Sequence, residues 1–179
     1  TTLAHEGYPG HLYQNLYSSA YLPPIRQLLN FGGYTEGWAT YVEMISYSYA
    51  AEGKPDHEAA AIVLAQKQRS MMLGISSLLD IFIHYYGFTR DNISHFLSEM
   101  GISSKAAVNS IYDAALESPA NYLKYYLGYL TFLDLQAYCQ QKWPDQFQLS
   151  DFHKRVLEIG PCQFPVLEKY LKLCYTDAL

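Results

Sequence analysis

Two histidines near the start of the chain lie six residues apart, and a proline and two glycines separate them. The segment reads His5-Glu6-Gly7-Tyr8-Pro9-Gly10-His11. On one continuous α-helix, six residues turn the chain by about 240° around the axis, so the two imidazoles would face apart. A proline inside a helix also costs about 3 kcal/mol. A helix in this segment must therefore break or kink near Pro9, and such a break can turn both histidines toward one point.

Capping and turn signals divide the rest of the chain into further helices. Thr35 is a candidate N-cap, and Gly53, Gly87, Gly101 and Gly160 mark expected helix ends. Helices are expected over residues 35–52, 55–86, 89–101, 103–117, 118–142, 150–160 and 163–174. No strand pattern, internal repeat or linker interrupts this series. The sequence therefore predicts a single compact, all-α, multi-helix domain over residues 1–179, with a broken helix at its N-terminal end.

The charge of the chain argues against one class of binding partner, nucleic acids. The formal net charge is −5, and no run of lysine or arginine is present. Nucleic-acid binding requires clustered basic side chains, so a nucleic-acid partner is not expected. The most apolar stretch, residues 71–83, is too short for a membrane span and contains Asp80. No membrane span is therefore expected in this segment.

His5, Glu6 and His11 are the residue types of a zinc site. Zinc binds neutral imidazole nitrogens, and a catalytic zinc site keeps one position open for water. The bound ion lowers the pKa of that water to about 7, and a nearby carboxylate that does not bind the metal can take its proton. Glu6, next to His5, is placed for this role. The alternative interpretation is two surface histidines beside a turn.

A third ligand is expected from the helix that follows Thr35. Glu36, Thr40, Glu43 and Tyr47 lie on one face of that helix. Carboxylates that face a protein interior need a partner, and a metal ion would supply one. Glu36 is a candidate ligand, and Glu43 is a candidate to orient a ligand through a hydrogen bond. A solvated acidic face is the alternative interpretation.

These residues, together with motifs farther along the chain, resemble the bacterial domain-of-unknown-function 885 (DUF885) family. The resemblance rests on His5-Glu6-x-x-Pro9-Gly10-His11-x-x-Gln14, Glu36-Gly37-Trp38-Ala39-x-Tyr41-x-Glu43, Asp80-x-x-x-His84, residues 119–128, Phe152-His153 through Gly160, and Leu167-Glu168. The chain departs from the family pattern at Ser76, Phe82 and Tyr126. These departures concern substrate contacts rather than the metal ligands.

The resemblance implies an α-helical, gluzincin-like metallopeptidase of bacteria. It implies zinc held by His5, His11 and Glu36, with Glu6 as the general base. Tyr125 and His153 occupy positions from which a tyrosine hydroxyl or a protonated imidazole would stabilise charge on the substrate carbonyl oxygen. Four further residues are expected to support the site without binding the metal, namely Gln14, Glu43, Asp80 and His84. For Asp80 and His84, four residues apart on one helix face, a structural link between helices is the alternative.

Members of the family are longer, and their His-Glu motif lies past their middle. The chain is therefore expected to be the C-terminal catalytic part of a longer protein, inactive if the missing N-terminal part completes the cleft. For that longer protein, an extracytoplasmic or lipoprotein location is expected.

Three functions remain open at this point. The first is zinc-dependent hydrolysis of peptide bonds in oligopeptides. The second is a di-metal carboxylate protein built from Glu6, Glu36, Glu43, Asp80 and His84, although paired Glu-x-x-His motifs are missing. The third is a helical binding module without catalysis.

Overall fold

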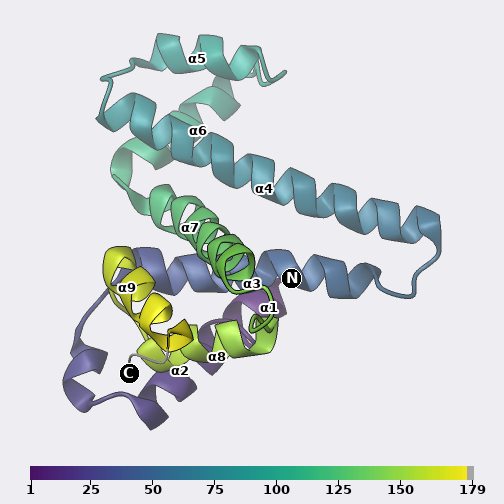
Figure 1. The fold of residues 1–179 in the computed structure, drawn as a ribbon. Helices are drawn as coiled ribbons and strands as arrows, with labels where there is room; N and C mark the ends of the chain where they lie inside the picture. Colours follow the sequence, from purple (N-terminus) through teal and green to yellow (C-terminus); the bar gives the residue numbers. More distant parts are fainter. Residues whose placement is uncertain (177–179) are drawn as a thin grey trace.

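The computed structural model describes residues 1–176, which form nine α-helices, one short 3-10 helix and no β-strand (Figure 1). The elements are α1 (Thr2–Glu6), α2 (His11–Tyr21), η1 (Pro24–Leu28), α3 (Gly32–Ala51), α4 (Asp56–His84), α5 (Arg90–Ser98), α6 (Lys105–Glu117), α7 (Asn121–Lys142), α8 (Leu149–Ile159) and α9 (Phe164–Tyr175). The predicted all-α fold is confirmed, and so is the predicted break in the first helix. None of these helices is long and apolar enough to cross a membrane.

Helices α3 and α7 cross at the centre of the molecule with their backbones almost in contact. A Cβ atom added at Gly37 would lie 2.6 Å from the Cα of Gly128, and one added at Gly128 would lie 2.3 Å from the carbonyl oxygen of Gly33. Glycine is required at this crossing because any side chain would push the two backbones apart. The crossing places Glu36 of α3 near Lys124 of α7, with 3.7 Å between Oε1 and Nζ.

Alanine at position 128 should destabilise the fold. The added methyl group must displace the backbone of α3, and overpacking of this kind costs about 1–3 kcal/mol. Each kcal/mol lowers the Tm by roughly 2–4 °C in a chain of this size. Thermal unfolding of Gly128→Ala measures the effect. Gly33→Ala is the matched control, because its Cβ would meet only a ring carbon of Phe164, at 3.4 Å. Equal Tm values for the two variants would contradict the close crossing.

Two hydrophobic clusters stabilise the helices. The larger lies between α3, α7, α8 and α9 and contains the buried residues Trp38, Tyr41, Phe132, Phe152 and Leu167. The smaller lies where α5 and α6 pack against the C-terminal half of α4, at the end of α4 remote from the α3–α4 turn (Figure 1). The metal residues predicted from the sequence belong to α1, α2 and α3, close to the larger cluster.

Two helix starts lie three residues from those expected, and the others lie within two residues. Helix α3 begins at Gly32, and the amide of Thr35 already donates to the carbonyl oxygen of Phe31 at 3.0 Å, so Thr35 is not the N-cap. Helix α7 begins at Asn121 rather than at residue 118. The amide of Ala120 donates to the buried carboxylate of Asp80 at 3.0 Å, and Ala120 has a φ of 62°. This tertiary hydrogen bond fixes a turn that local sequence signals do not reveal.

Candidate metal centre

The break between α1 and α2 brings the two histidines of the first motif together. Helix α1 ends at Glu6 and α2 begins at His11. In the loop between them, Gly10 lies so close to α1 that an added Cβ would be 1.8 Å from the carbonyl oxygen of His5. The indole Nε1 of Trp38 donates to the carbonyl oxygen of Pro9 at 3.0 Å and ties the loop to α3. The imidazole centroids of His5 and His11 are consequently 4.9 Å apart, at 86° to one another.

Glu36 completes a group of three metal-ligating side chains. Its Oε2 lies 3.2 Å from Nε2 of His11 and 3.7 Å from Nε2 of His5. One ligand atom from each of the three residues lies within 4.8 Å of the others, and no other group of three or more such residues occurs within residues 1–176. Three separate helices therefore deliver the three ligands predicted from the sequence to one point.

Glu43 fixes the orientation of His5. Its Oε2 accepts a hydrogen bond from Nδ1 of His5 at 3.0 Å, which leaves Nε2 of His5 directed toward Glu36. The carboxylate of Glu43 is buried, and Arg69 of α4 donates to it through Nε at 2.9 Å and through a terminal nitrogen at 3.3 Å. A carboxylate that holds the second nitrogen of a ligating imidazole is a recurrent feature of zinc sites.

The charges of this cluster favour a bound cation. Hydrogen bonds to Glu36 and Glu43 raise the pKa of His5 to about 9. Burial opposes the ionisation of Glu36, but hydrogen bonds from His11 and His5 outweigh burial and lower its pKa. For Glu43, burial also opposes ionisation, but hydrogen bonds from His5 and Arg69 outweigh burial and lower its pKa. Ionised carboxylates next to two imidazoles form a donor set that fits zinc, which would take the place of the proton on His5.

A cleft of about 550 Å³ opens beside the cluster, and the predicted catalytic residues Glu6 and Tyr125 both line it. Glu6 is exposed at the end of α1. The ring of Tyr125 stacks against that of His5, with 6.2 Å between centroids and 23° between planes. Burial and the negative charge of Glu36 raise the pKa of the Tyr125 hydroxyl, so it stays protonated and able to donate. The ammonium of Lys124 lies 5.2 Å from the centroid of the Tyr125 ring.

A family model described as "Bacterial protein of unknown function (DUF885)" matches residues 1–171. This chain belongs to the DUF885 family. Among curated proteins, none matches the chain.

Two solved structures resemble this DUF885 chain. One, a candidate lipoprotein of Colwellia psychrerythraea, matches with a TM-score of 0.80 and 27% identity over 97% of the chain. The other, a candidate lipoprotein of unknown function from Shewanella oneidensis, matches with a TM-score of 0.79 and 23% identity over 96% of the chain. The chain spans 29% of the first protein and 31% of the second.

His153, predicted as a catalytic residue of the DUF885 chain, lies elsewhere. Its ring packs at 5.5 Å from the rings of both Trp38 and Tyr41, and its Nε2 lies 2.9 Å from the Tyr41 hydroxyl. None of its contacts is to His5, His11 or Glu36. Burial lowers the pKa of His153 to about 4, so the imidazole is neutral at pH 7. This environment favours a neutral imidazole, and the catalytic role of His153 stays a prediction.

The half-buried His153 should make the protein sensitive to acid. Its folded-state pKa of about 4 lies below the ordinary value of 6.5, so the unfolded chain binds more protons between these two values. The contribution of His153 to the free energy of unfolding is fully present above pH 6.5. It is lost as the pH falls toward 4, and the loss is at most about 3 kcal/mol. Urea unfolding at pH 7 and pH 4.5 should show a smaller loss for His153→Gln than for the unmodified protein. An equal loss in both proteins would contradict the neutral half-buried imidazole.

The remaining predicted supporting residues divide into two groups. Gln14 is buried on α2, and its side-chain amide has no hydrogen-bond partner within residues 1–176. Asp80 and His84 hold the α6–α7 connection instead of the metal ligands. Asp80 accepts from the Ala120 amide, and Nε2 of His84 lies 3.0 Å from the carbonyl oxygen of Ala115. The structural alternative for this pair therefore agrees with the structure, and the residues needed for a di-metal site are not gathered.

Two residues of the site were not predicted from the sequence, namely Arg69 and Lys124. Arg69 could have been suspected from the α3–α4 hairpin, because residues equally far from its turn at Gly53 face one another. That register pairs Glu43 with residue 63, six residues before Arg69, so it points to the first half of α4 but does not single out Arg69. Nothing in the sequence marks Lys124, because its position depends on the crossing of α3 and α7.

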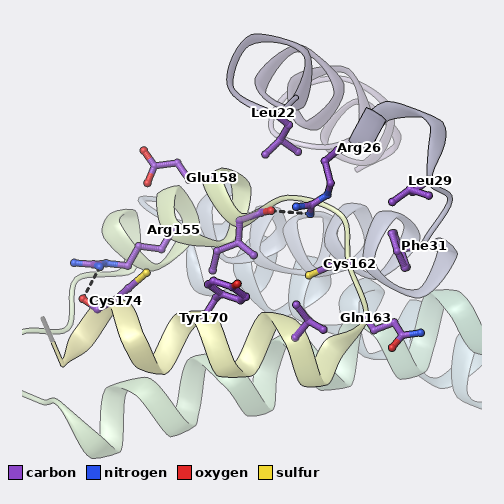
Figure 2. A pocket seen from close by; sticks show the side chains of 12 residues that line it. Leu22, Arg26, Leu29, Phe31, Arg155, Glu158, Cys162, Gln163, Tyr170 and Cys174 are labelled. Carbon is purple, nitrogen blue, oxygen red and sulfur yellow. Dashed lines mark hydrogen bonds between the residues drawn. The ribbon is translucent and has the colours of Figure 1, made fainter. Parts of the chain in front are cut away.

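A cavity of about 690 Å³ lies apart from the cleft of the metal cluster (Figure 2). It lies between the α2–η1 segment and helices α8 and α9. Both of its arginines are occupied with main-chain carbonyls. Arg26 donates to the carbonyl oxygens of Ile159 and Pro161 at 3.0 and 2.9 Å, and Arg155 donates to that of Cys174 at 2.8 Å. These arginines cap the C-terminal ends of α8 and α9.

Proposed function

We propose that this DUF885 chain carries the zinc site of a peptidase that hydrolyses peptide bonds in oligopeptides. The observation that carries the proposal is the convergence of His5, His11 and Glu36, together with the hydrogen bond that reserves Nε2 of His5 for the shared point. Three protein ligands and one open position are the arrangement of catalytic zinc sites. The resemblance of the motifs to gluzincin-like metallopeptidases supports the same function.

Glu6 is proposed as the general base. When bound, zinc supplies a Lewis acid and a water of lowered pKa. Glu6 lines the cleft, and no side chain within residues 1–176 forms a hydrogen bond or an ion pair with its carboxylate. The carboxylate is therefore free to accept a proton from the attacking water and to deliver it to the leaving amine.

Tyr125 is proposed to stabilise the negative charge that develops on the carbonyl oxygen. Its hydroxyl remains a donor at neutral pH, and its ring is held between His5 and the Lys124 ammonium. A hydrogen-bond donor that already points to the site of the developing charge stabilises the transition state without a further rearrangement of the protein. Glu43 and Arg69 act indirectly in this proposal, since they hold the imidazole of His5 in position.

Metal removal tests the proposal. We expect the purified protein to contain one zinc ion per chain by plasma mass spectrometry and to cleave a mixed peptide library. Treatment with 1,10-phenanthroline should lower cleavage by at least about 100-fold, because the Lewis acid contributes several kcal/mol. Added zinc should restore activity. Cleavage that persists in metal-free protein would contradict a zinc peptidase.

The Glu43→Gln variant tests whether zinc binds at the proposed site or adventitiously elsewhere. This variant keeps all three ligands and alters only the partner of His5, and loss of such a partner weakens zinc binding by about 10- to 100-fold. Glu99→Gln, at the exposed end of α5, is the matched control and should bind zinc normally. Equal zinc affinity in both variants would remove the role assigned to Glu43.

We also propose that the protein acts outside the cytoplasm. The solved relative with 27% identity is described as a candidate lipoprotein, which supports this location. Fractionation of the source cells should recover the protein with membranes or with the periplasm. Recovery in the cytoplasmic fraction would contradict the proposal.

A further inference from the structure

Another cavity, of about 530 Å³, adjoins the loop between the two candidate histidine ligands and is distinct from the metal cleft. Side chains of α2, α3 and α8 and of the α1–α2 loop form its walls. Six of the residues that line it carry aromatic rings. We call this cavity the aromatic pocket, and the six residues are Tyr8, Tyr13, Tyr17, Trp38, Tyr49 and His153. Its volume falls within the usual range for small-molecule sites.

The rings of the aromatic pocket are arranged as a rim and an inner wall. Tyr8 and Tyr49 are 73% and 64% exposed and stand at the rim. Tyr13 packs edge-on against Tyr8, with 4.9 Å between centroids. Trp38 lines the inner end of the cavity and is only 1% exposed, and its Nε1 is already bonded to the Pro9 carbonyl oxygen, so it forms an apolar inner wall and offers no donor. Such surfaces favour an aromatic ligand packed edge-to-face or with an offset.

His153 supplies a hydrogen-bond acceptor among these rings. The Tyr41 hydroxyl donates its single proton to Oε1 of Gln136 at 2.6 Å. Nε2 of His153, which lies 2.9 Å from the same hydroxyl oxygen, must therefore be the donor in that contact. In the neutral imidazole, Nδ1 then keeps its lone pair. No hydrogen bond to Nδ1 occurs within residues 1–176, so this nitrogen is available to a ligand.

The charge at the cavity argues against an anionic ligand. The basic side chain that lines it is Lys154, whose ammonium is 3.8 Å from the carboxylate of Glu158. A purely apolar ligand would remove Nδ1 of His153 from water without giving it a hydrogen bond, and this would weaken binding. The complementary ligand is a neutral aromatic ring that carries one hydrogen-bond donor.

We propose that the aromatic pocket binds a phenol, with the ring against Trp38 and the tyrosines and the hydroxyl donating to Nδ1 of His153. A free phenolic compound and the tyrosine side chain of a peptide share this chemistry. The pocket does not use the metal ligands, so binding is expected with or without zinc. The inference therefore stands or falls separately from the proposed peptidase activity.

Fluorine NMR of protein labelled with 5-fluorotryptophan provides a direct test. The chain has two tryptophans, and the second, Trp143, stacks on Tyr175 away from the pocket. The Trp143→Phe variant assigns the two signals. We expect p-cresol to shift the Trp38 signal saturably and to leave the Trp143 signal unchanged. Toluene lacks the hydroxyl and should bind at least about fivefold more weakly.

Two variants and one peptide sharpen the test. His153→Phe keeps a ring but removes the acceptor, so p-cresol and toluene should then bind within about twofold of each other. Tyr49→Ala, at the rim, should weaken both ligands. Tighter binding of a blocked Gly-Tyr-Gly peptide than of p-cresol would identify a peptide side chain as the ligand, and the reverse order a free phenol.

The proposal is overturned if p-cresol causes no saturable shift of the Trp38 signal, or if it binds no better than toluene. It is also overturned if a folded His153→Phe protein retains the preference for p-cresol. The comparison of the two ligands on unmodified protein does not depend on the folding of any variant. Chelator-treated protein should give the same affinities, which separates this result from the state of the zinc site.

Discussion

Replacement of Glu6 by glutamine should lower peptide hydrolysis by about 100- to 10,000-fold while zinc remains bound. Glutamine has nearly the same size as glutamate but cannot accept the proton of the attacking water. Glu6 lines the cleft and makes no hydrogen bond or ion pair within residues 1–176, so the substitution leaves the fold intact. Initial rates on a mixed peptide library, read by mass spectrometry, measure the effect, and zinc content is determined on the same samples.

Glu99→Gln is the matched control for this experiment. It makes the same chemical change at an exposed position at the end of α5, and its hydrolysis rate should equal that of the unmodified protein. A Glu6→Gln protein that contains zinc and cleaves peptides at the normal rate would exclude Glu6 as the general base. Loss of zinc together with activity would show that Glu6 acts on the metal ligands instead.

Replacement of Gly10 by alanine should disrupt the metal centre more than a change at any supporting residue. The added Cβ would lie 1.8 Å from the carbonyl oxygen of His5 and 2.4 Å from that of Ala4. Both are main-chain atoms of α1, so no side-chain movement can relieve the overlap. Helix α1 must shift and carry His5 away from His11 and Glu36. Loss of a residue that only supports a metal ligand weakens metal binding by up to about 100-fold. Displacement of the ligand His5 itself should therefore lower zinc affinity by at least that much.

Gly32→Ala is the control for the substitution at Gly10. A Cβ at Gly32, in the first turn of α3, would meet the Cδ of Lys124 at 3.5 Å, which is an ordinary contact. Its zinc affinity should be unchanged, and alanine adds helix propensity of roughly 0.5–1 kcal/mol. Circular dichroism distinguishes a local change from global unfolding. Normal zinc binding by Gly10→Ala would show that the α1–α2 loop can adopt another shape.

The helical architecture follows closely from local signals in the sequence. The glycines and prolines that interrupt the chain predict where most helices end, because they disfavour continued helical hydrogen bonding. The break at Pro9 was predicted in the same way, from the cost of proline in a helix and the six-residue spacing of the histidines. The start of α7, which was wrong, depends on a contact with another element, whereas α3 begins three residues before the expected cap at Thr35. Asp80, for example, fixes the turn before α7 from 40 residues away.

The candidate site shows the same division between local and distant interactions. Five residues of the site could be proposed from the sequence because their motifs resemble those of the DUF885 family, namely His5, Glu6, His11, Glu36 and Glu43. Arg69, which neutralises part of the charge on Glu43, is not recognisable in this way. Its role arises from the register of α3 against α4. The turn at Gly53 points to the first half of α4, but it does not single out Arg69 among the twelve basic residues of the chain.

His153 illustrates what sequence motifs leave undetermined. Its position in a family motif predicted an imidazole at the reacting carbonyl, but the packing of α8 on α3 places it among aromatic rings and suppresses its charge. The amino-acid sequence contains the candidate metal ligands His5, His11 and Glu36, and it predicts the break between the two histidines, because that break depends on the short-range conformational preferences of proline and glycine. The partners of those ligands, the walls of the cleft and the aromatic pocket depend on how helices cross, because burial and hydrogen bonding between distant segments exist only in the folded chain.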